Sequence, residues 1–220
     1  MTTAGHAAHT LADTIANRLT HPDTVPAPWT SRRWWRQSLA HGAPGVALLH
    51  IERAAAGLAP WQPAHDWLTY TTRGPVTTGP DSHLYYGAPA LAHALACAAA
   101  TRPGCYERAL DTVDHTIIAD VHRRVAAAHA RIDRGDRPAL AEFDVIRGLA
   151  GVGSYLLRRH PDSEATRAVL DYLVRLTQPV TVDGETLPGW WTPSAPSGRD
   201  DRRFDGGHAN TGLAHGISVI

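Results

Sequence analysis

The sequence predicts an all-α fold built from stacked helix pairs, and three observations support that prediction. Apolar residues recur with helical spacing along most of the chain, as at Leu11, Ile15 and Leu19. A glycine-led motif occurs four times at intervals of 45 to 68 residues, which is the scale of helical repeats. Strand-like patterns are scarce, and residues 180–182 form the main short run of that kind.

The expected helices follow from this periodicity and from the Gly and Pro residues that bound each segment. The first helix contains residues 11–19 and stops before Pro22. Further helices are expected at 44–56, 61–71, 88–100, 105–132, 148–159 and 162–177. The run 180–182 is followed by Asp183 and Gly184, which predicts either a hairpin or plain loop.

Residues 178–211 are rich in Pro and Gly and predict a long connection. Connections of this length without secondary structure are uncommon in compact domains, and they are usually functional or disordered. The adjacent Trp190 and Trp191 favour an ordered loop that packs on another part of the chain, whereas the alternative is a flexible segment.

Composition excludes several classes of protein. The 220 residues contain 21 basic and 21 acidic side chains, and this balance argues against a nucleic-acid-binding module. The two cysteines, Cys97 and Cys105, form neither a disulfide framework nor a C-x-x-C metal pair. No run approaches the roughly 20 apolar residues of a transmembrane helix. The polar N-terminus does not resemble a secretory signal, so a cytoplasmic location is expected.

The recurring motif places a glycine directly before an apolar helix. A glycine there removes Cβ and lets two backbones approach closely, and the small residues Gly45, Ala90 and Gly151 one turn later extend this approach. The pattern predicts an inner ring of tightly packed helices surrounded by longer, more charged outer ones. The alternative is that Gly-Ala-Pro simply begins helices, since proline suits a first turn. The four aligned glycines are Gly42, Gly87, Gly148 and Gly216.

Only four residues follow Gly216, so the sequence predicts a domain that stops at the start of an inner helix. We expect one C-terminally truncated domain over 1–220. It would comprise an N-terminal helix with a Pro-rich lead-in at 1–34, helical repeats at 35–177, a long loop at 178–212 and the start of a truncated inner helix at 213–220.

Two stretches that contain copies of the glycine-led motif, together with the order of all the copies, resemble a known family. The stretch FDVIRGLAGVG at 143–153 and the stretch NTGLAHG at 210–216 are similar to segments of lanthionine synthetase C-like proteins, the cyclases of class I lanthipeptide (lantibiotic) biosynthesis. The resemblance covers the chain from about residue 35 onward. It implies an α/α toroid of seven inner and seven outer helices, of which this chain would supply about half, incomplete at its C-terminal side.

The resemblance also implies a reaction and its partners. Family members add a peptide cysteine thiol to dehydroalanine or dehydrobutyrine within a dehydrated precursor peptide, which closes a thioether ring. The precursor implies a partner dehydratase. Asp144 and His215 match the active-site aspartate and histidine of the family, and this pair is expected to handle protons at the reacting centre. Alternatively, Asp144 is a helix N-cap and His215 a packed histidine at a helix start.

The family binds zinc through cysteines and a histidine in Trp-Cys-Tyr-Gly and Cys-His-Gly segments, and neither segment occurs in this sequence. No zinc ligand can therefore be assigned, and we expect no metal bound to this chain. A free thiol is only a few per cent thiolate at neutral pH, so little or no cyclase activity is expected from the chain alone.

Three alternatives remain. The chain could be a non-catalytic peptide-binding or scaffold protein, or half of a split cyclase. A related α/α-toroid (six-hairpin) glycosidase would instead need two carboxylates about 5–10 Å apart.

Overall fold

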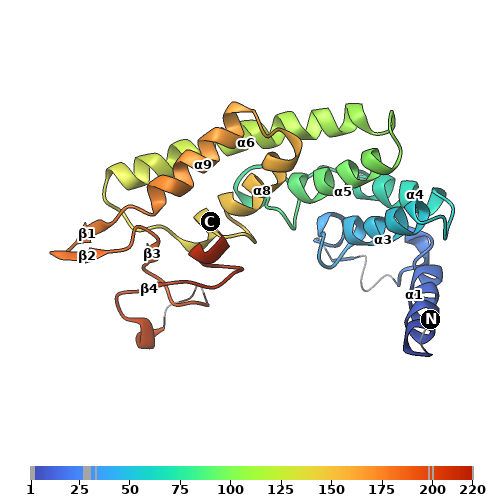
Figure 1. Cartoon of the computed structure of the whole chain (residues 1–220), viewed down its shortest axis with the longest axis horizontal. Coiled ribbons are helices and arrows are strands. Elements are labelled where there is room, and N and C mark those ends of the chain that lie inside the picture. Colours follow the sequence, from blue (N-terminus) through green and yellow to red (C-terminus); the bar gives the residue numbers. More distant parts are fainter. Residues whose placement is uncertain (1–2, 27–30, 33, 198, 200, 220) are drawn as a thin grey trace. The chain divides into compact units, whose positions relative to one another are not determined.

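The computed structural model describes residues 3–26, 31–32, 34–197, 199 and 201–219. The chain divides into two compact units, which are described separately. The first comprises Met1–Thr77 and Tyr85–Val113, and the second comprises Thr78–Leu84 and Asp114–Ile220. Helices dominate both units (Figure 1), as the sequence predicts.

The first unit contains four α-helices in its described part. They are α1 (Thr3–Arg18), α3 (Ala43–Ala55), α4 (Gln62–Thr71) and α5 (Ala88–Thr101). Helix α3 packs against both α4 and α5. Each of these three begins with a proline in its first turn, where the missing N–H costs no hydrogen bond. Trp67 and Ile51 are fully buried in this core. Helix α5 consists mainly of Ala and Leu, and more than half of its residues are buried, as expected for a predominantly apolar helix.

The second unit is built on the long helix α6 (Glu107–Asp133), whose first turns belong to the first unit. Helix α8 (Leu149–Arg159) packs beside α9 (Glu164–Leu176), which Ser163 caps through its hydroxyl. The short α7 (Leu140–Phe143) precedes α8 and was not expected, because four residues are too few to show a helical period.

Asp114 connects α6 to α8 inside the second unit. Asp114 is 2% exposed. Its carboxylate accepts hydrogen bonds from the Tyr155 hydroxyl, from Arg159 (Nη2, 3.1 Å) and from the His160 ring (Nε2, 2.9 Å). Burial and the adjacent carboxylate raise the pKa of the Tyr155 hydroxyl. A buried charge with this many partners is satisfied, and it fixes the position of α8 on α6.

The segment after α9 contains two short antiparallel ladders. Strands β1 (Val180–Val182) and β2 (Glu185–Leu187) form a hairpin around Asp183 and Gly184, which both have positive φ as tight hairpin turns require. The hairpin alternative is therefore the correct one. Strands β3 (Trp191–Thr192) and β4 (His208–Ala209) also pair, inside the stretch expected to be loop. Two-residue strands are too short to produce an alternating pattern, which explains why the sequence did not reveal them.

Three of the four aligned glycines lie at the N-terminal ends of helices, as predicted: Gly42 before α3, Gly87 before α5 and Gly148 before α8. The expected close approach is also confirmed. A Cβ at Gly45 would lie 2.2 Å from the Leu39 carbonyl oxygen, and a Cβ at Gly151 would lie 1.9 Å from that of Val145. The glycine one turn into α3 and into α8 therefore makes room for the backbone that precedes the helix.

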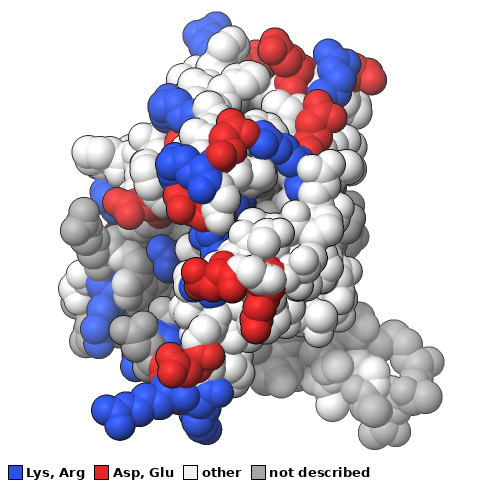
Figure 2. Space-filling model, turned by 90° about the vertical axis from the view of Figure 1, so that its left-hand side faces the viewer, with Lys and Arg blue, Asp and Glu red and all other residues white. Residues whose placement is uncertain are grey.

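The surface carries both signs of charge. On the face drawn in Figure 2, basic and acidic side chains alternate instead of gathering into one charged area, which matches the formal net charge of zero. Within the described residues, none of the helices combines the length and hydropathy needed to cross a bilayer.

Candidate active site

The third and fourth copies of the glycine-led motif meet within the second unit. The Val145 N–H donates to the Ala214 carbonyl (3.2 Å), which holds the two segments together. Gly148 and Gly216 each donate their N–H to the carbonyl four residues earlier, at 3.0 and 2.8 Å, so both segments turn in the same way. This joint places Asp144 next to His215, although 71 residues separate them in sequence.

The Asp144 carboxylate is 2% exposed, and both of its oxygens are used. Oδ1 accepts hydrogen bonds from the backbone N–H groups of Arg147 (2.6 Å) and Gly148 (2.8 Å). Oδ2 lies 2.7 Å from the Nδ1 atom of His215. The capping role and the contact with histidine are thus compatible, because a carboxylate has one oxygen for each.

His215 is held on one side and open on the other. Its side chain is 49% exposed, and its Nδ1 contacts the buried carboxylate. An ionised carboxylate only accepts hydrogen bonds, so it selects the imidazole form with the proton on Nδ1. The Nε2 atom has no hydrogen-bonding partner within the described ranges of the chain. A basic nitrogen is thereby presented to any molecule that reaches the site.

Two further side chains hold the Asp144 turn, and sequence reasoning missed both. Arg124 donates from Nη2 to the Arg147 carbonyl (2.8 Å), and His83 hydrogen-bonds to the backbone of Ile146. Burial lowers the pKa of the Arg124 guanidinium, while Asp120 opposes that shift. His83 stands four residues before Gly87, as Asp144 stands four residues before Gly148, so the repeat register contained a signal for it.

The residues present do not fit the zinc ion that the family resemblance implies. Neither Cys97 nor Cys105 lies in a segment like those from which the family takes its zinc ligands. Across the described part of the chain, no three His, Cys, Asp or Glu residues are grouped so that they could hold a metal ion. No chemical step is therefore assigned to zinc in this chain.

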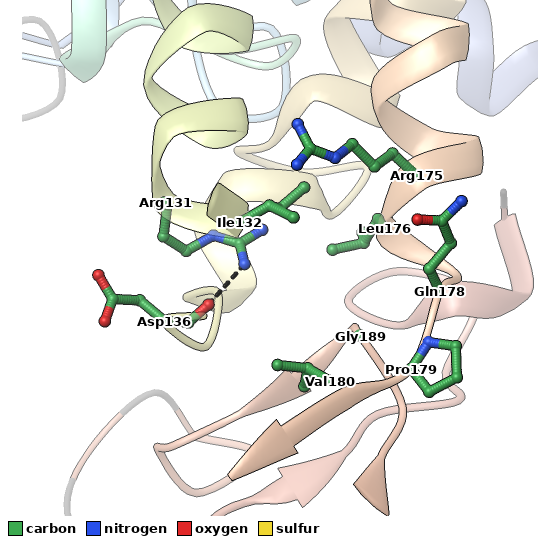
Figure 3. Close-up of a pocket in the computed structure, with 9 residues that line it drawn as sticks. All are labelled: Arg131, Ile132, Asp136, Arg175, Leu176, Gln178, Pro179, Val180 and Gly189. Carbon is green, nitrogen blue, oxygen red and sulfur yellow. Dashed lines mark hydrogen bonds between the residues drawn. The ribbon is translucent and has the colours of Figure 1, made fainter. Parts of the chain in front are cut away.

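A separate pocket of about 120 Å³ lies between the ends of α6 and α9 and strand β1 (Figure 3). Its lining residues are Arg131, Ile132, Asp136, Arg175, Leu176, Gln178, Pro179, Val180 and Gly189. The Arg131 guanidinium is already engaged by Glu142 (2.8 and 3.1 Å) and by the Asp136 carbonyl (2.7 Å). Neither Asp144 nor His215 lines this pocket, so it is not the predicted site.

Comparison with known proteins agrees with the resemblance. The sequence model of the lanthionine synthetase C-like protein family matches residues 33–220. Among solved structures, nisin cyclase matches with a TM-score of 0.65 and 21% identity, over 96% of this chain and 50% of that chain. The chain thus spans half the length of nisin cyclase. No curated protein sequence matches it. The structural likeness confirms the predicted all-α, α/α-toroid fold, and the family match shows that the chain belongs to the lanthionine synthetase C-like family.

Proposed function

We propose that Asp144 and His215 form the proton-transfer centre of a lanthipeptide cyclase. The substrate would be a precursor peptide that a dehydratase has converted at serine or threonine to dehydroalanine or dehydrobutyrine. The 2.7 Å contact between the buried Asp144 carboxylate and the half-exposed His215 ring is the observation that supports this role most directly. Family membership supplies the class of reaction.

The proposed step moves one proton through His215. The Nε2 atom accepts the proton of the attacking cysteine thiol while sulfur forms a bond to the β-carbon of the dehydroamino acid. The π electrons of the C=C bond shift toward the α-carbon and its carbonyl as an enolate. The His215 imidazolium then returns the proton to the α-carbon. The thiol hydrogen is thus transferred to carbon, and the ring closes without an oxidant or a leaving group.

Asp144 is suited to support this transfer without moving. Its Oδ1 is fixed by two backbone N–H groups, and its Oδ2 orients the imidazole and stabilises the imidazolium that forms during the step. A buried carboxylate fixed on both sides keeps His215 in one orientation, which reduces the reorganisation required at the moment of reaction.

We further propose that activation of the thiol depends on groups this chain does not contain. The sequence has neither of the family's zinc-ligand segments, and an unactivated thiol is a weak nucleophile at neutral pH. Residues 1–220 would then have low activity unless those segments are supplied. A cytoplasmic location fits this reaction, because thiols stay reduced there.

The test uses a dehydrated peptide that carries one cysteine. Cyclisation leaves the mass unchanged but removes the thiol, so alkylation followed by mass spectrometry counts the unreacted peptide. The chain would be assayed alone and with a second polypeptide that carries the Trp-Cys-Tyr-Gly and Cys-His-Gly segments plus zinc. We expect slow cyclisation alone and faster, zinc-dependent cyclisation with the second polypeptide.

His215→Ala tests the assigned pair, with His41→Ala as the matched control on a glycine-led segment of the first unit. Loss of the general acid–base group is expected to slow ring closure about 10²–10⁴-fold. Equal rates for the two variants would rule out His215 as the proton carrier. If the peptide co-purifies with the chain but never cyclises under either condition, the peptide-binding alternative is the better description.

A further inference from the structure

We infer that His83 is a positioning residue for the Asp144–His215 pair, since it holds the turn that carries Asp144. The effect of His83 on catalysis rests on the proposed function. Its role in positioning Asp144 rests only on contacts within the second unit. His83 comes from the glycine-led segment that precedes the one containing Asp144.

The register of the repeat explains why His83 is there. Successive glycine-led segments pair in a fixed register. The residue four positions before the glycine of one segment lies beside the residue immediately before the glycine of the next segment. Ser38 and Tyr86 show this pairing in the first unit, where they form an isolated antiparallel bridge. Asp144 and His215 show it in the second unit. The same register pairs His83 with Arg147, which flanks the Asp144 turn.

The contacts of the segment that carries His83 agree with this register. The imidazole hydrogen-bonds to the backbone of Ile146, two residues after Asp144. The Cβ of the adjacent Leu84 lies close to the first turn of α8, 3.3 Å from the position that a Cβ on Gly151 would take. Residues 78–84 also group with the second unit, although the chain on both sides of them belongs to the first. The segment therefore lies against the Asp144 turn.

The charges around His83 favour a neutral imidazole. Its pKa is lowered chiefly by burial and then by the nearby Arg147 guanidinium, with a smaller lowering by Arg124. The Asp144 carboxylate and the bond to the Ile146 backbone oppose the shift. A neutral ring keeps one N–H for the backbone carbonyl and adds no positive charge that would compete with His215 for the carboxylate.

The decisive comparison removes the His83 donor and then restores one. His83→Leu removes it at similar volume, His83→Gln returns an N–H donor, and His41→Leu serves as the matched control. The full chain would be labelled with ¹⁵N on histidine. NMR would then record the tautomer of His215 and the low-field Nδ1–H proton expected for a hydrogen bond to the carboxylate.

We expect His83→Leu to broaden or shift the Nδ1–H signal of His215 while the fold is kept, and we expect His83→Gln and His41→Leu to leave it in place. An unchanged signal in a folded His83→Leu protein would overturn the inference, and so would an equal loss in the Gln and Leu variants.

Turnover in the complemented cyclisation assay provides the second readout. His83→Leu should lower kcat by up to about 100-fold with little change in KM, because a misplaced carboxylate affects the chemical step. If the His215 signal changes but no variant or wild-type chain ever cyclises peptide, the positioning role stands and the proposed function fails. If the His83→Leu chain cyclises at the wild-type rate, the positioning role fails and the proposed function stands.

Discussion

The two units contain the same backbone joint with different side chains on it. In the first unit the Leu39 N–H donates to the Tyr85 carbonyl (2.9 Å), and in the second the Val145 N–H donates to the Ala214 carbonyl (3.2 Å). In both joints the donor stands three residues before its glycine and the acceptor two residues before the next one. The repeat thus produces the geometry of the joint in both places, independently of any reactive side chain.

The difference lies in what caps the turn. In the first unit, the Ser38 hydroxyl accepts the N–H of His41 (3.1 Å), and in the second, Asp144 Oδ1 accepts the N–H of the equivalent Arg147 (2.6 Å). A serine has a single side-chain oxygen, whereas an aspartate has a second one, and Asp144 uses it to hold His215. The second joint thus differs at two positions, because Asp144 stands where the first has Ser38 and His215 stands where the first has Tyr86. Together these two differences place a carboxylate beside an imidazole.

The largest expected effect comes from removing that second acceptor. Asp144→Asn keeps an oxygen for the two backbone N–H groups, but its amide NH₂ would face Nδ1 of His215. The imidazole would then carry its proton on Nε2 and could no longer accept one from a thiol. By analogy with triad aspartates, we expect ring closure in the complemented assay to fall about 10³–10⁴-fold.

Ser38→Ala is the matched change in the first unit. It removes one capping hydrogen bond, so unfolding free energy should fall by about 1 kcal/mol while the cyclisation rate stays the same. Denaturant titration and the alkylation assay measure the two quantities on each variant. Comparable loss of activity in both variants would show that the two joints do not differ in function as proposed.

The next effect concerns the glycines that both joints share. A Cβ at Gly148 would lie 2.2 Å from the Asp144 backbone nitrogen, and a Cβ at Gly42 would lie 1.9 Å from the Trp35 carbonyl oxygen. Backbone atoms cannot move aside as flexible side chains can, so Gly148→Ala and Gly42→Ala should each lower the unfolding free energy by about 1–3 kcal/mol.

The NMR spectrum of ¹⁵N-labelled histidine should distinguish the two glycine variants. Only Gly148→Ala displaces Asp144, so it alone should alter the His215 Nδ1–H signal. Gly212→Ala is a milder control, because its Cβ would meet only the Asn210 side-chain oxygen at 3.1 Å. A wild-type His215 signal in Gly148→Ala would mean that the turn tolerates the extra methyl group without moving the carboxylate.

The helical fold could be predicted from the sequence because its signals are local and repeated. Helix starts at Gly42, Gly87 and Gly148 follow from Gly and Pro beside apolar runs, and the structure begins helices there. The proximity of Asp144 and His215 came from the family resemblance, because no local rule relates residues 71 positions apart. Their catalytic roles remain predictions that the assays above address.

Other features could not be predicted because their signals are weak or non-local. The β3–β4 ladder has two residues per strand, and it is stabilised by contacts such as the Trp191 indole N–H to the Gly206 carbonyl (2.9 Å). Arg124 donates to the Arg147 carbonyl from the middle of α6. That helix contains several arginines, and nothing in the sequence distinguishes Arg124 from the others. Such contacts depend on where the elements pack, which a single sequence does not specify.

The smallest expected effect is a difference in acid sensitivity, and it compares one histidine from each unit. Burial is the main cause that lowers the pKa of His50 in the first unit and of His83 in the second. Between the lowered pKa and the ordinary value of about 6.5, the unfolded chain binds more protons than the folded one. The stability that each neutral ring contributes is therefore complete above about pH 6.5 and is lost as the pH falls below it.

Amide hydrogen exchange on either side of that pH should show each unit losing protection in acid. His50→Gln should reduce the loss in the first unit, and His83→Gln should reduce it in the second. Removing the Arg147 guanidinium should raise the pKa of His83, so Arg147→Gln should also reduce the loss of protection in the second unit. An unchanged loss in that variant would contradict the effect of Arg147 on the pKa of His83.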